Sequence, residues 1–192
     1  AYRDSLDQDL LDLSVGQRGY KRLLWAGSAA VGSGLQALYA LETMNNDGPW
    51  TVPEGLHRRN AVFSLSSTSP QESWQASAMS YRAQWTATDQ IPQRLLGVGG
   101  FGLFDSLDPS SGGLTARDSL SWQWQRRVQP SSSDDAQPGW WKASAYLIRY
   151  GLNLYSNFTY ALLNPQQGDQ FKQSDDRVVK GGEISRSAVH RW

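Results

Sequence analysis

Residues 139–163 read GWWKASAYLIRYGLNLYSNFTYALL, and this stretch decides the fold class. Every second residue from Tyr146 to Leu154 is apolar, and over the same span the other face becomes small or polar, as at Arg149 and Asn153. A period of two with one apolar and one polar face is typical of a β-strand. The run is much longer than the ~5–6 residues of an ordinary strand. It therefore favours the wall of a transmembrane barrel over a sandwich.

Composition narrows the possible chemistry of the chain. The 192 residues suffice for one domain, and 18 basic against 18 acidic residues leave no net charge with which to bind a nucleic acid. No cysteine is present, which excludes disulfides and Cys-based metal sites. The two histidines, His57 and His190, lie too far apart to form a recognisable metal motif. We therefore expect neither a bound metal nor a cofactor.

Hydropathy and aromatic content bear on a membrane location. No run approaches the ~18–20 apolar residues of a membrane helix, but a barrel strand needs only ~9–11 alternating residues. The chain has nine Trp and eight Tyr, residue types that are favoured at the membrane–water boundary. The same aromatic content also suits a Trp-rich soluble β-protein such as a lectin, so composition leaves both alternatives open.

Alternating stretches separated by turn-forming residues run along the whole chain. They predict strands over residues 9–15, 20–30, 35–44, 59–67, 74–87, 118–128, from 139 onward, and 177–192. The connections after the second strand are short, long, short, very long, medium and long. Membrane barrels alternate short turns with long loops in this way. The sequence thus predicts an all-β, antiparallel, up-and-down transmembrane barrel wall of about eight strands, with no helix.

The polar residues of these strands fit a barrel that is apolar outside and polar inside. The polar side chains expected opposite the aromatic ones are Arg82, Gln84, Gln123, Gln125, Arg149 and Asn153. The aromatic and aliphatic side chains expected to contact lipid are Trp122, Trp124, Tyr146, Ile148 and Tyr150. A sugar-stacking platform is the alternative reading of this second group.

Three stretches resemble the barrel of TonB-dependent outer-membrane receptors. They are Gly16–Ser28 (GQRGYKRLLWAGS), Asn46–Trp50 (NDGPW) with the strand that follows at Asn60, and Ser80–Arg94 (SYRAQWTATDQIPQR) with Phe101-Gly102 and Asp105–Gly113 beyond it. The resemblance covers most of the chain from about Asp9. The similarity extends over whole strands and loops and does not rest on a single motif, because the family shares few short motifs in its barrel.

The resemblance implies a fold, a location and a function. Members of that family have an N-terminal plug, a short TonB-contacting segment before it, and a barrel of about 22 strands. They import iron chelates, cobalamin, other metals or sugars with energy delivered through TonB. Residues 1–192 would be the N-terminal part of such a barrel in a bacterial outer membrane, without the plug. The implied partners are outer-membrane lipid, a small-molecule ligand, and TonB only through the plug segment missing here.

Candidate ligand contacts follow from location alone. They are Arg82 and Arg149, expected to line the lumen, and Trp50, Gln90, Arg94 and Phe101, expected in the long loops. The two arginines could instead form salt bridges within the wall. A segment with two unpaired strand edges is not expected to transport a ligand by itself.

Motifs that would indicate an enzyme are missing. The cluster Gly97–Gly102 lacks the Lys-Ser/Thr that follows a phosphate loop, and no G-x-S-x-G elbow occurs. The acidic loop residues lack the spacing of a calcium loop. We therefore expect no catalytic activity. Two alternatives to a receptor segment remain, a complete small outer-membrane barrel of eight strands and a soluble carbohydrate-binding β-sandwich.

Overall fold

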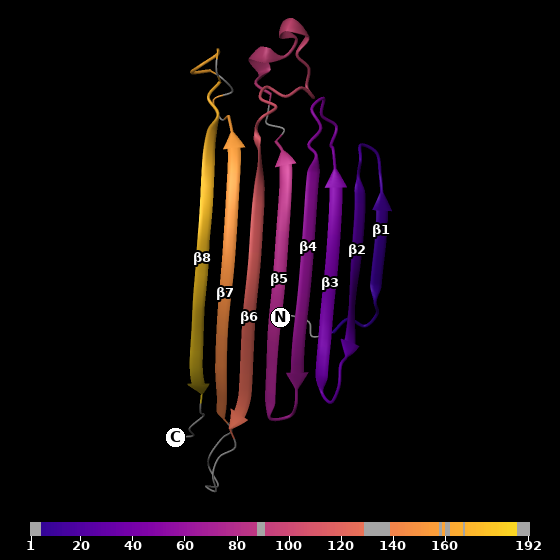
Figure 1. Cartoon of the computed structure of the whole chain (residues 1–192), viewed down its shortest axis with the longest axis vertical. Coiled ribbons are helices and arrows are strands. Elements are labelled where there is room, and N and C mark those ends of the chain that lie inside the picture. Colours follow the sequence, from indigo (N-terminus) through magenta and orange to yellow (C-terminus); the bar gives the residue numbers. More distant parts are fainter. Residues whose placement is uncertain are drawn as a thin grey trace.

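The eight predicted strands form a single antiparallel sheet. The computed structural model describes residues 5–87, 91–128, 139–157, 159, 162–166 and 168–187. Each strand pairs with its neighbours in sequence, so the order is β1-β2-β3-β4-β5-β6-β7-β8 (Figure 1). The strands are β1 (Leu10–Val15), β2 (Lys21–Ala30), β3 (Leu35–Asn46), β4 (Leu56–Thr68), β5 (Glu72–Thr86), β6 (Gly112–Val128), β7 (Gly139–Ser156) and β8 (Phe171–Ser187). The prediction of an all-β, up-and-down fold is confirmed.

The sheet is open. Within the described residues β1 pairs only with β2, and β8 pairs only with β7. The described strands therefore do not form a closed eight-stranded barrel. They do not form the two stacked sheets of a sandwich either, because all eight belong to one sheet.

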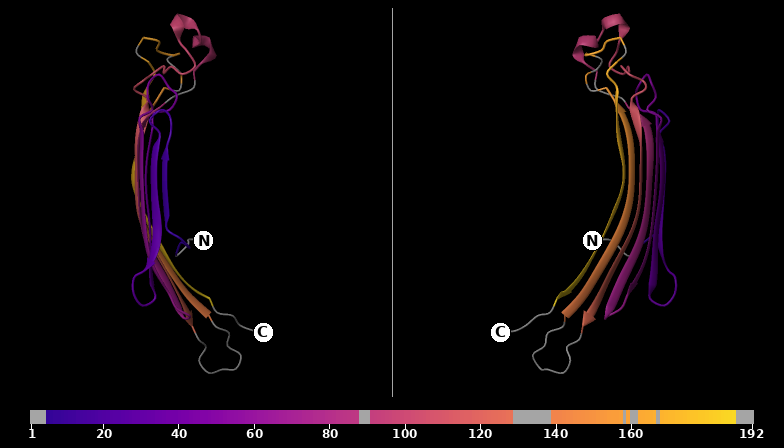
Figure 2. Two further views of the ribbon diagram at one scale, coloured as in Figure 1. Left: turned by 90° about the vertical axis from the view of Figure 1, so that its right-hand side faces the viewer. Right: turned by 60° about the vertical axis from the view of Figure 1, so that its left-hand side comes forward.

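Strand connections alternate between the two ends of the sheet, and the short β1–β2 turn lies at the same end as the β3–β4 and β5–β6 connections (Figure 1). The connections β3–β4, β5–β6 and β7–β8 gather at one end, called here the loop end, and the β2–β3 and β4–β5 turns lie at the other, the turn end (Figures 1 and 2). At the turn end the chain reverses with a Val31 N–H to Leu35 C=O bond of 3.0 Å and a Ser69 N–H to Glu72 C=O bond of 2.8 Å. Figure 2 shows that the sheet is bent and not flat.

Several strands extend further toward the loop end than predicted. β6 begins at Gly112 and not at Asp118, and β8 begins at Phe171 and not at Arg177. The added residues of β8 carry polar side chains on both faces, and those of β6 begin with two glycines, so hydrophobic periodicity does not mark these segments as strand. The β5–β6 loop also contains two short 3₁₀ turns, η1 (Gln93–Leu95) and η2 (Val98–Gly100), where no helix was predicted.

Strand register divides the side chains into two faces, named here after neighbouring residues of β6. The Trp122 face carries Leu120, Trp122 and Trp124, and the Ser121 face carries Ser119, Ser121 and Gln123. Residues that are directly paired across strands share a face, so the pairing assigns every strand residue to one of the two. A set of directly paired residues across the sheet is called a row below.

The sheet has no hydrophobic core of its own. Among the described residues the buried hydrophobic side chains are three alanines, Ala26, Ala37 and Ala83, and no large side chain is fully buried. Large apolar side chains lie exposed instead, such as Phe63 at 52% and Leu120 at 57%. A single layer leaves both of its faces uncovered, so its apolar side chains need an environment other than the chain itself.

Aromatic rings cover glycines on neighbouring strands. Tyr146 lies directly opposite Gly181, and a Cβ added to Gly181 would lie 2.6 Å from the Tyr146 hydroxyl. Trp85 covers Gly113 in the same manner, with its ring 2.9 Å from the position of an added Cβ. The missing side chain lets the ring lie flat against the backbone, which fixes the pairing of these positions.

Candidate functional site

Register corrects the expected grouping of the wall residues. Trp122 is paired with Ala145 and Ser121 with Tyr146, so the tryptophans of β6 lie on the opposite face from Tyr146, Ile148 and Tyr150. The prediction that these five side chains share one face is wrong. The six polar residues also divide. Gln123 and Gln125 lie on the Ser121 face, and the four on the Trp122 face are Arg82, Gln84, Arg149 and Asn153.

Apolar side chains form a band across the Trp122 face. Its members are Leu11, Leu13, Leu23, Trp25, Leu35, Ala37, Tyr39, Leu41, Ala61, Phe63, Leu65, Trp74, Ala76, Ala78, Leu120, Trp122, Trp124, Trp141, Ala143, Ala145, Leu147 and Ile184. Toward the turn end the band finishes in tryptophans, with Trp74 directly opposite Trp124 and Trp141 near them on β7. Toward the loop end polar side chains follow it on most strands, although Val15, Leu114 and Val178 are apolar residues of the same face that lie at or beyond its edge.

The boundary of this band toward the loop end runs diagonally. From β2 to β8, the first polar side chains beyond the band are Lys21, Thr43, Arg59, Ser80, Asp118, Arg149 and Lys180. Lys21 belongs to the row that ends at Ser174 on β8, whereas the boundary on β8 is at Lys180. The boundary has therefore moved six residues toward the turn end by the time it reaches β8.

Three arginines lie at or just beyond this boundary, Arg59 on β4, Arg82 on β5 and Arg149 on β7. Arg82 binds Asp118 through both ends of its guanidinium, with distances of 2.9 Å from Nη1 to Oδ1 and 2.6 Å from Nη2 to Oδ2. Arg149 is paired with Asp118 across β6 and β7, and Arg59 is paired with Arg82 across β4 and β5. Among the described residues, Arg82–Asp118 is the one ion pair on the Trp122 face.

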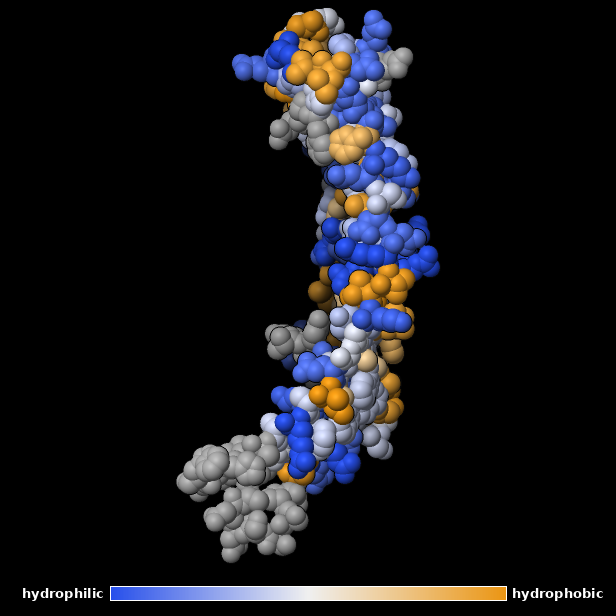
Figure 3. Space-filling model, turned by 90° about the vertical axis from the view of Figure 1, so that its left-hand side faces the viewer, coloured by the Kyte–Doolittle hydropathy of each residue, from blue (hydrophilic) through white to orange (hydrophobic). Residues whose placement is uncertain are grey.

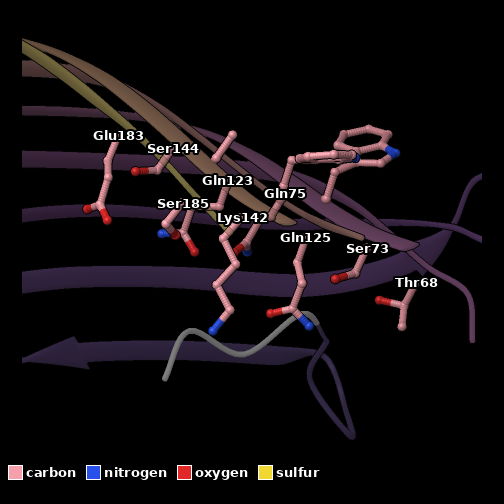
Figure 4. Close-up of a pocket in the computed structure, with 12 residues that line it drawn as sticks. Thr68, Ser73, Gln75, Gln123, Gln125, Lys142, Ser144, Glu183 and Ser185 are labelled. Atoms are coloured by element: carbon pink, nitrogen blue, oxygen red, sulfur yellow. The ribbon is translucent and has the colours of Figure 1, made fainter. Parts of the chain in front are cut away.

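The Ser121 face is hydroxyl-rich and amide-rich near the turn end. A hollow of about 610 Å³ there is lined by side chains from β4 to β8, and Figure 4 shows the labelled ones extending from the same side of the sheet. Ser64 and Ser77 are hydrogen-bonded through their hydroxyls at 2.9 Å, and the Gln75 side-chain amide donates to Ser64 at 2.9 Å. Lys142 and Glu183 are the charged residues of the lining. Such a surface suits water or a neutral polar partner.

An ionic network lies on the same face of β1 to β4. Glu42 accepts from Arg22 Nε at 2.7 Å, from Arg58 Nη2 at 3.1 Å and from the Asn60 side-chain amide at 2.8 Å. Arg22 also binds Asp12 at 2.8 Å. The Glu42 side chain is only 12% exposed, so its charge is compensated by these donors and not by water alone. Sequence analysis missed this network, although its members alternate with the apolar residues of their strands.

The loop-end candidates partly come together. Trp50 in the β3–β4 loop packs against Phe104 in the β5–β6 loop, with ring centroids 6.0 Å apart. The Thr51 N–H donates to the Phe104 carbonyl at 2.9 Å and the Thr51 hydroxyl donates to Asp105 at 2.6 Å. Phe101 closes the η2 turn by donating its N–H to the Val98 carbonyl at 3.1 Å. Two loops are thereby held as one unit.

The β7–β8 loop joins this unit through polar contacts. The Gln170 side-chain amide donates to Ser110 at 2.8 Å and to Asp108 at 3.2 Å. Arg94 lies in η1, and Gln90 falls outside the described residues. Exposed apolar side chains such as Leu103 lie in the β5–β6 loop, and Figure 3 shows hydrophobic residues gathered at the loop end.

Hydrogen bonds perturb the acidity of one loop carboxylate. The Thr51 hydroxyl and the Gly102 N–H both donate to Asp105, and they lower its pKa because they stabilise the ionised form, while partial desolvation acts in the opposite direction. The ionised carboxylate thus holds the β3–β4 and β5–β6 loops together at neutral pH.

No family model, curated protein or solved structure matches this chain. The geometry is therefore the basis for assigning a role. In the described part of the chain, no three His, Cys, Asp or Glu residues are grouped as metal ligands would be. Likewise, none of the described helices is long and apolar enough to cross a membrane.

Proposed function

We propose that the chain forms part of the wall of an outer-membrane, TonB-dependent receptor that takes up a small ligand. The main support for this proposal is the apolar band of the Trp122 face, which has tryptophans toward the turn end and charged residues toward the loop end. On β7 the apolar side chains extend from Trp141 to Leu147, about 20 Å at ~3.3 Å per residue, and the charged Arg149 follows about 26 Å from Trp141. For strands tilted by about 35° from the membrane normal, the height from Trp141 to Arg149 is about 22 Å, close to the apolar belt of ~25 Å that outer-membrane barrels present to lipid.

The diagonal boundary supports the same proposal. Six residues along a strand amount to ~20 Å, and six strand spacings from β2 to β8 amount to ~29 Å. Rows in an antiparallel sheet run perpendicular to the strands. A boundary parallel to a membrane surface would then require strands tilted by about 35° from the membrane normal, within the ~35–45° of membrane barrels. A soluble single sheet gives no reason for a straight diagonal boundary.

The proposal assigns the two faces to two solvents. The Trp122 face meets lipid and the Ser121 face meets the lumen, so the ionic network of Glu42 and the Ser-rich and Gln-rich hollow are lumenal. Arg82 and Arg149 then lie on the outside of the wall, beyond the lipid chains, and not in the lumen as first expected. Water can surround polar groups of the lumen, which removes the cost of burying them.

The open edges and the lack of a core support a segment over a complete small barrel. In lipid every backbone N–H and C=O must be paired, so β1 and β8 require further strands for closure. The joined β3–β4, β5–β6 and β7–β8 loops carry the aromatic residues that a ligand meets first, and Trp50, Arg94 and Phe101 remain the candidates. The ligand classes proposed are iron chelates, other metals, cobalamin and sugars, without any catalytic step.

Spin labelling of two adjacent residues tests the wall assignment. The chain has no cysteine, so Ala145→Cys on the Trp122 face and Ser144→Cys on the Ser121 face each give one labelling site. In phospholipid vesicles the label at 145 should collide more often with dissolved oxygen, and the label at 144 with a water-soluble nickel complex. Equal access of the nickel complex to both labels, or a chain that stays soluble and monomeric without detergent, would refute the assignment.

Fluorescence tests the receptor role separately. Ferric chelates, cobalamin and oligosaccharides are titrated against the vesicle-bound chain, and the signal of the Trp50→Phe variant is subtracted to isolate Trp50. One class should change the Trp50 emission. If no class does, the loop unit around Trp50 is not the ligand contact.

A further inference from the structure

We propose that the Trp122 face holds a binding site for a lipid with a phosphate monoester headgroup, with the phosphate between Arg59 and Arg82 and the acyl chain in the apolar groove beside them. The site rests on the proposed function in one respect, that this face meets lipid. The inference adds that one class of lipid is held selectively at a defined place on β2 to β7.

Two adjoining hollows provide space for the two parts of such a molecule. The first, about 400 Å³, has Arg59, Arg82 and the hydroxyl-bearing residues Thr43 and Ser80 in its lining. Glu42 also lines it, and its carboxylate accepts from Arg22 and Arg58. The second, about 710 Å³, is lined mainly by apolar side chains, including Phe63, Leu120 and Leu147. The two hollows have Trp25, Leu41, Ala61 and Ser80 in common, so they are continuous. A polar compartment joined to an apolar one fits an amphiphile.

Charge points to an anion in the polar compartment. Arg59 and Arg82 are directly paired on one face, which places their Cβ atoms ~4.5–5.5 Å apart and makes like charges repel. Asp118 neutralises one guanidinium by binding Arg82, and Arg149 adds a third positive charge beside Asp118. Lys180 and Asp176, the diagonal neighbours of Arg149 on β8, cancel each other. An excess of positive charge therefore remains beside the Arg59–Arg82 pair.

Guanidinium geometry favours phosphate over other lipid headgroups. A phosphate monoester offers several oxygens and up to two negative charges, so it can accept from two guanidiniums at once and relieve their repulsion. The phosphate of a zwitterionic choline lipid carries one charge and is accompanied by its own cation, so it compensates the pair less well. The site is placed where the apolar band ends, which is the depth at which a headgroup meets its acyl chains.

Lipid titration of the folded chain in uncharged maltoside micelles tests the proposal. Native mass spectrometry counts bound phosphatidic acid against phosphatidylcholine with the same acyl chains, and inorganic phosphate alone is a third arm. Phosphatidic acid should bind at least roughly tenfold tighter than phosphatidylcholine, as charge-assisted contacts to two arginines imply. Equal binding of the two lipids would overturn the headgroup site. Inorganic phosphate that binds as tightly as the lipid would overturn the role of the groove.

Three variants locate the site. Arg59→Gln combined with Arg82→Gln should remove the preference for phosphatidic acid, whereas Asp118→Asn should strengthen binding because it frees the Arg82 guanidinium. The matched control is Arg117→Gln, which changes an arginine of the neighbouring strand β6 on the Ser121 face. An equal loss in the control variant would overturn the location. If the spin labels at 144 and 145 behave as expected but lipid selectivity is missing, the wall assignment stands and this inference alone fails.

Discussion

Leu120 and Ser121 are neighbours on β6 whose side chains point to opposite faces, so a charge placed at either position tests which face meets lipid. Leu120 lies two residues from Asp118 and four from Trp124, or ~7 Å and ~13 Å along the strand. It is therefore well inside the apolar band. An arginine on the lipid side costs ~2–4 kcal/mol at the bilayer midplane and less toward the interfaces, so we expect Leu120→Arg to lower the free energy of unfolding by ~2–3 kcal/mol.

Ser121→Arg is the matched control for the same strand and nearly the same depth. On the proposed assignment its side chain would enter a lumen lined by hydroxyl and amide groups, so we expect a change in the free energy of unfolding below ~1 kcal/mol. Both variants are unfolded by urea from phosphatidylcholine vesicles and followed by tryptophan fluorescence, with the slope of the transition compared to ensure that the same surface is exposed.

The soluble-protein alternative makes a different forecast for Leu120. At 57% exposure in a water-soluble sheet, Leu120→Arg should change stability by no more than ~0.5 kcal/mol. Equal effects of the two substitutions in vesicles, or a larger effect at Ser121, would refute the assignment of the Trp122 face to lipid.

Three further outcomes are expected. Gly181→Ala should destabilise the chain by ~1–3 kcal/mol, because the new methyl group meets the ring of Tyr146. Adding Tyr146→Ala should remove that clash. A urea titration in which the double variant is no more stable than the single variant contradicts the ring-over-glycine contact. Glu42→Gln should lower the free energy of unfolding by ~1–3 kcal/mol, and Asp12→Asn should lower it less, because Glu42 compensates two arginines. Equal urea midpoints for the parent chain and both variants would show that the network contributes nothing to stability. Asp105 has a lowered pKa, so its contribution to loop stability is present at neutral pH and is lost as the pH falls below ~4. Hydrogen exchange of the β5–β6 loop, corrected for the intrinsic rate, should become faster below that pH and also in the Asp105→Asn variant at pH 7. Unchanged protection contradicts the role of the carboxylate.

Sequence pattern predicted the number, order and antiparallel pairing of the strands because each of those features is local. Alternation marks a strand, and turn residues such as Gly32 and Pro70 mark where the chain reverses. The strand ends near the loops were missed because β6 begins with two glycines, which are turn formers, and residues 171–176 of β8 are mostly polar on both faces.

The assignment of faces could not be read from the sequence. Alternation shows that Trp122 and Ser121 point in opposite directions, but it does not show which of them shares a face with Tyr146 on the next strand. That depends on register, and a shift of one residue exchanges the two faces of a strand. Treating aromatic residues as lipid-facing on every strand therefore grouped Tyr146 with Trp122, although β7 presents Tyr146 to the opposite side.

Contacts in this sheet are confined to strands that follow one another in the chain, and this has a consequence for how it assembles. Each described strand after β1 pairs with its predecessor in the chain, so folding can advance one hairpin at a time. A slip at the Val31–Gly34 turn would be passed on to β3 and, through the sequential pairing, to the strands after it. The tight turns, the smallest parts of the molecule, therefore govern the fidelity of the whole wall.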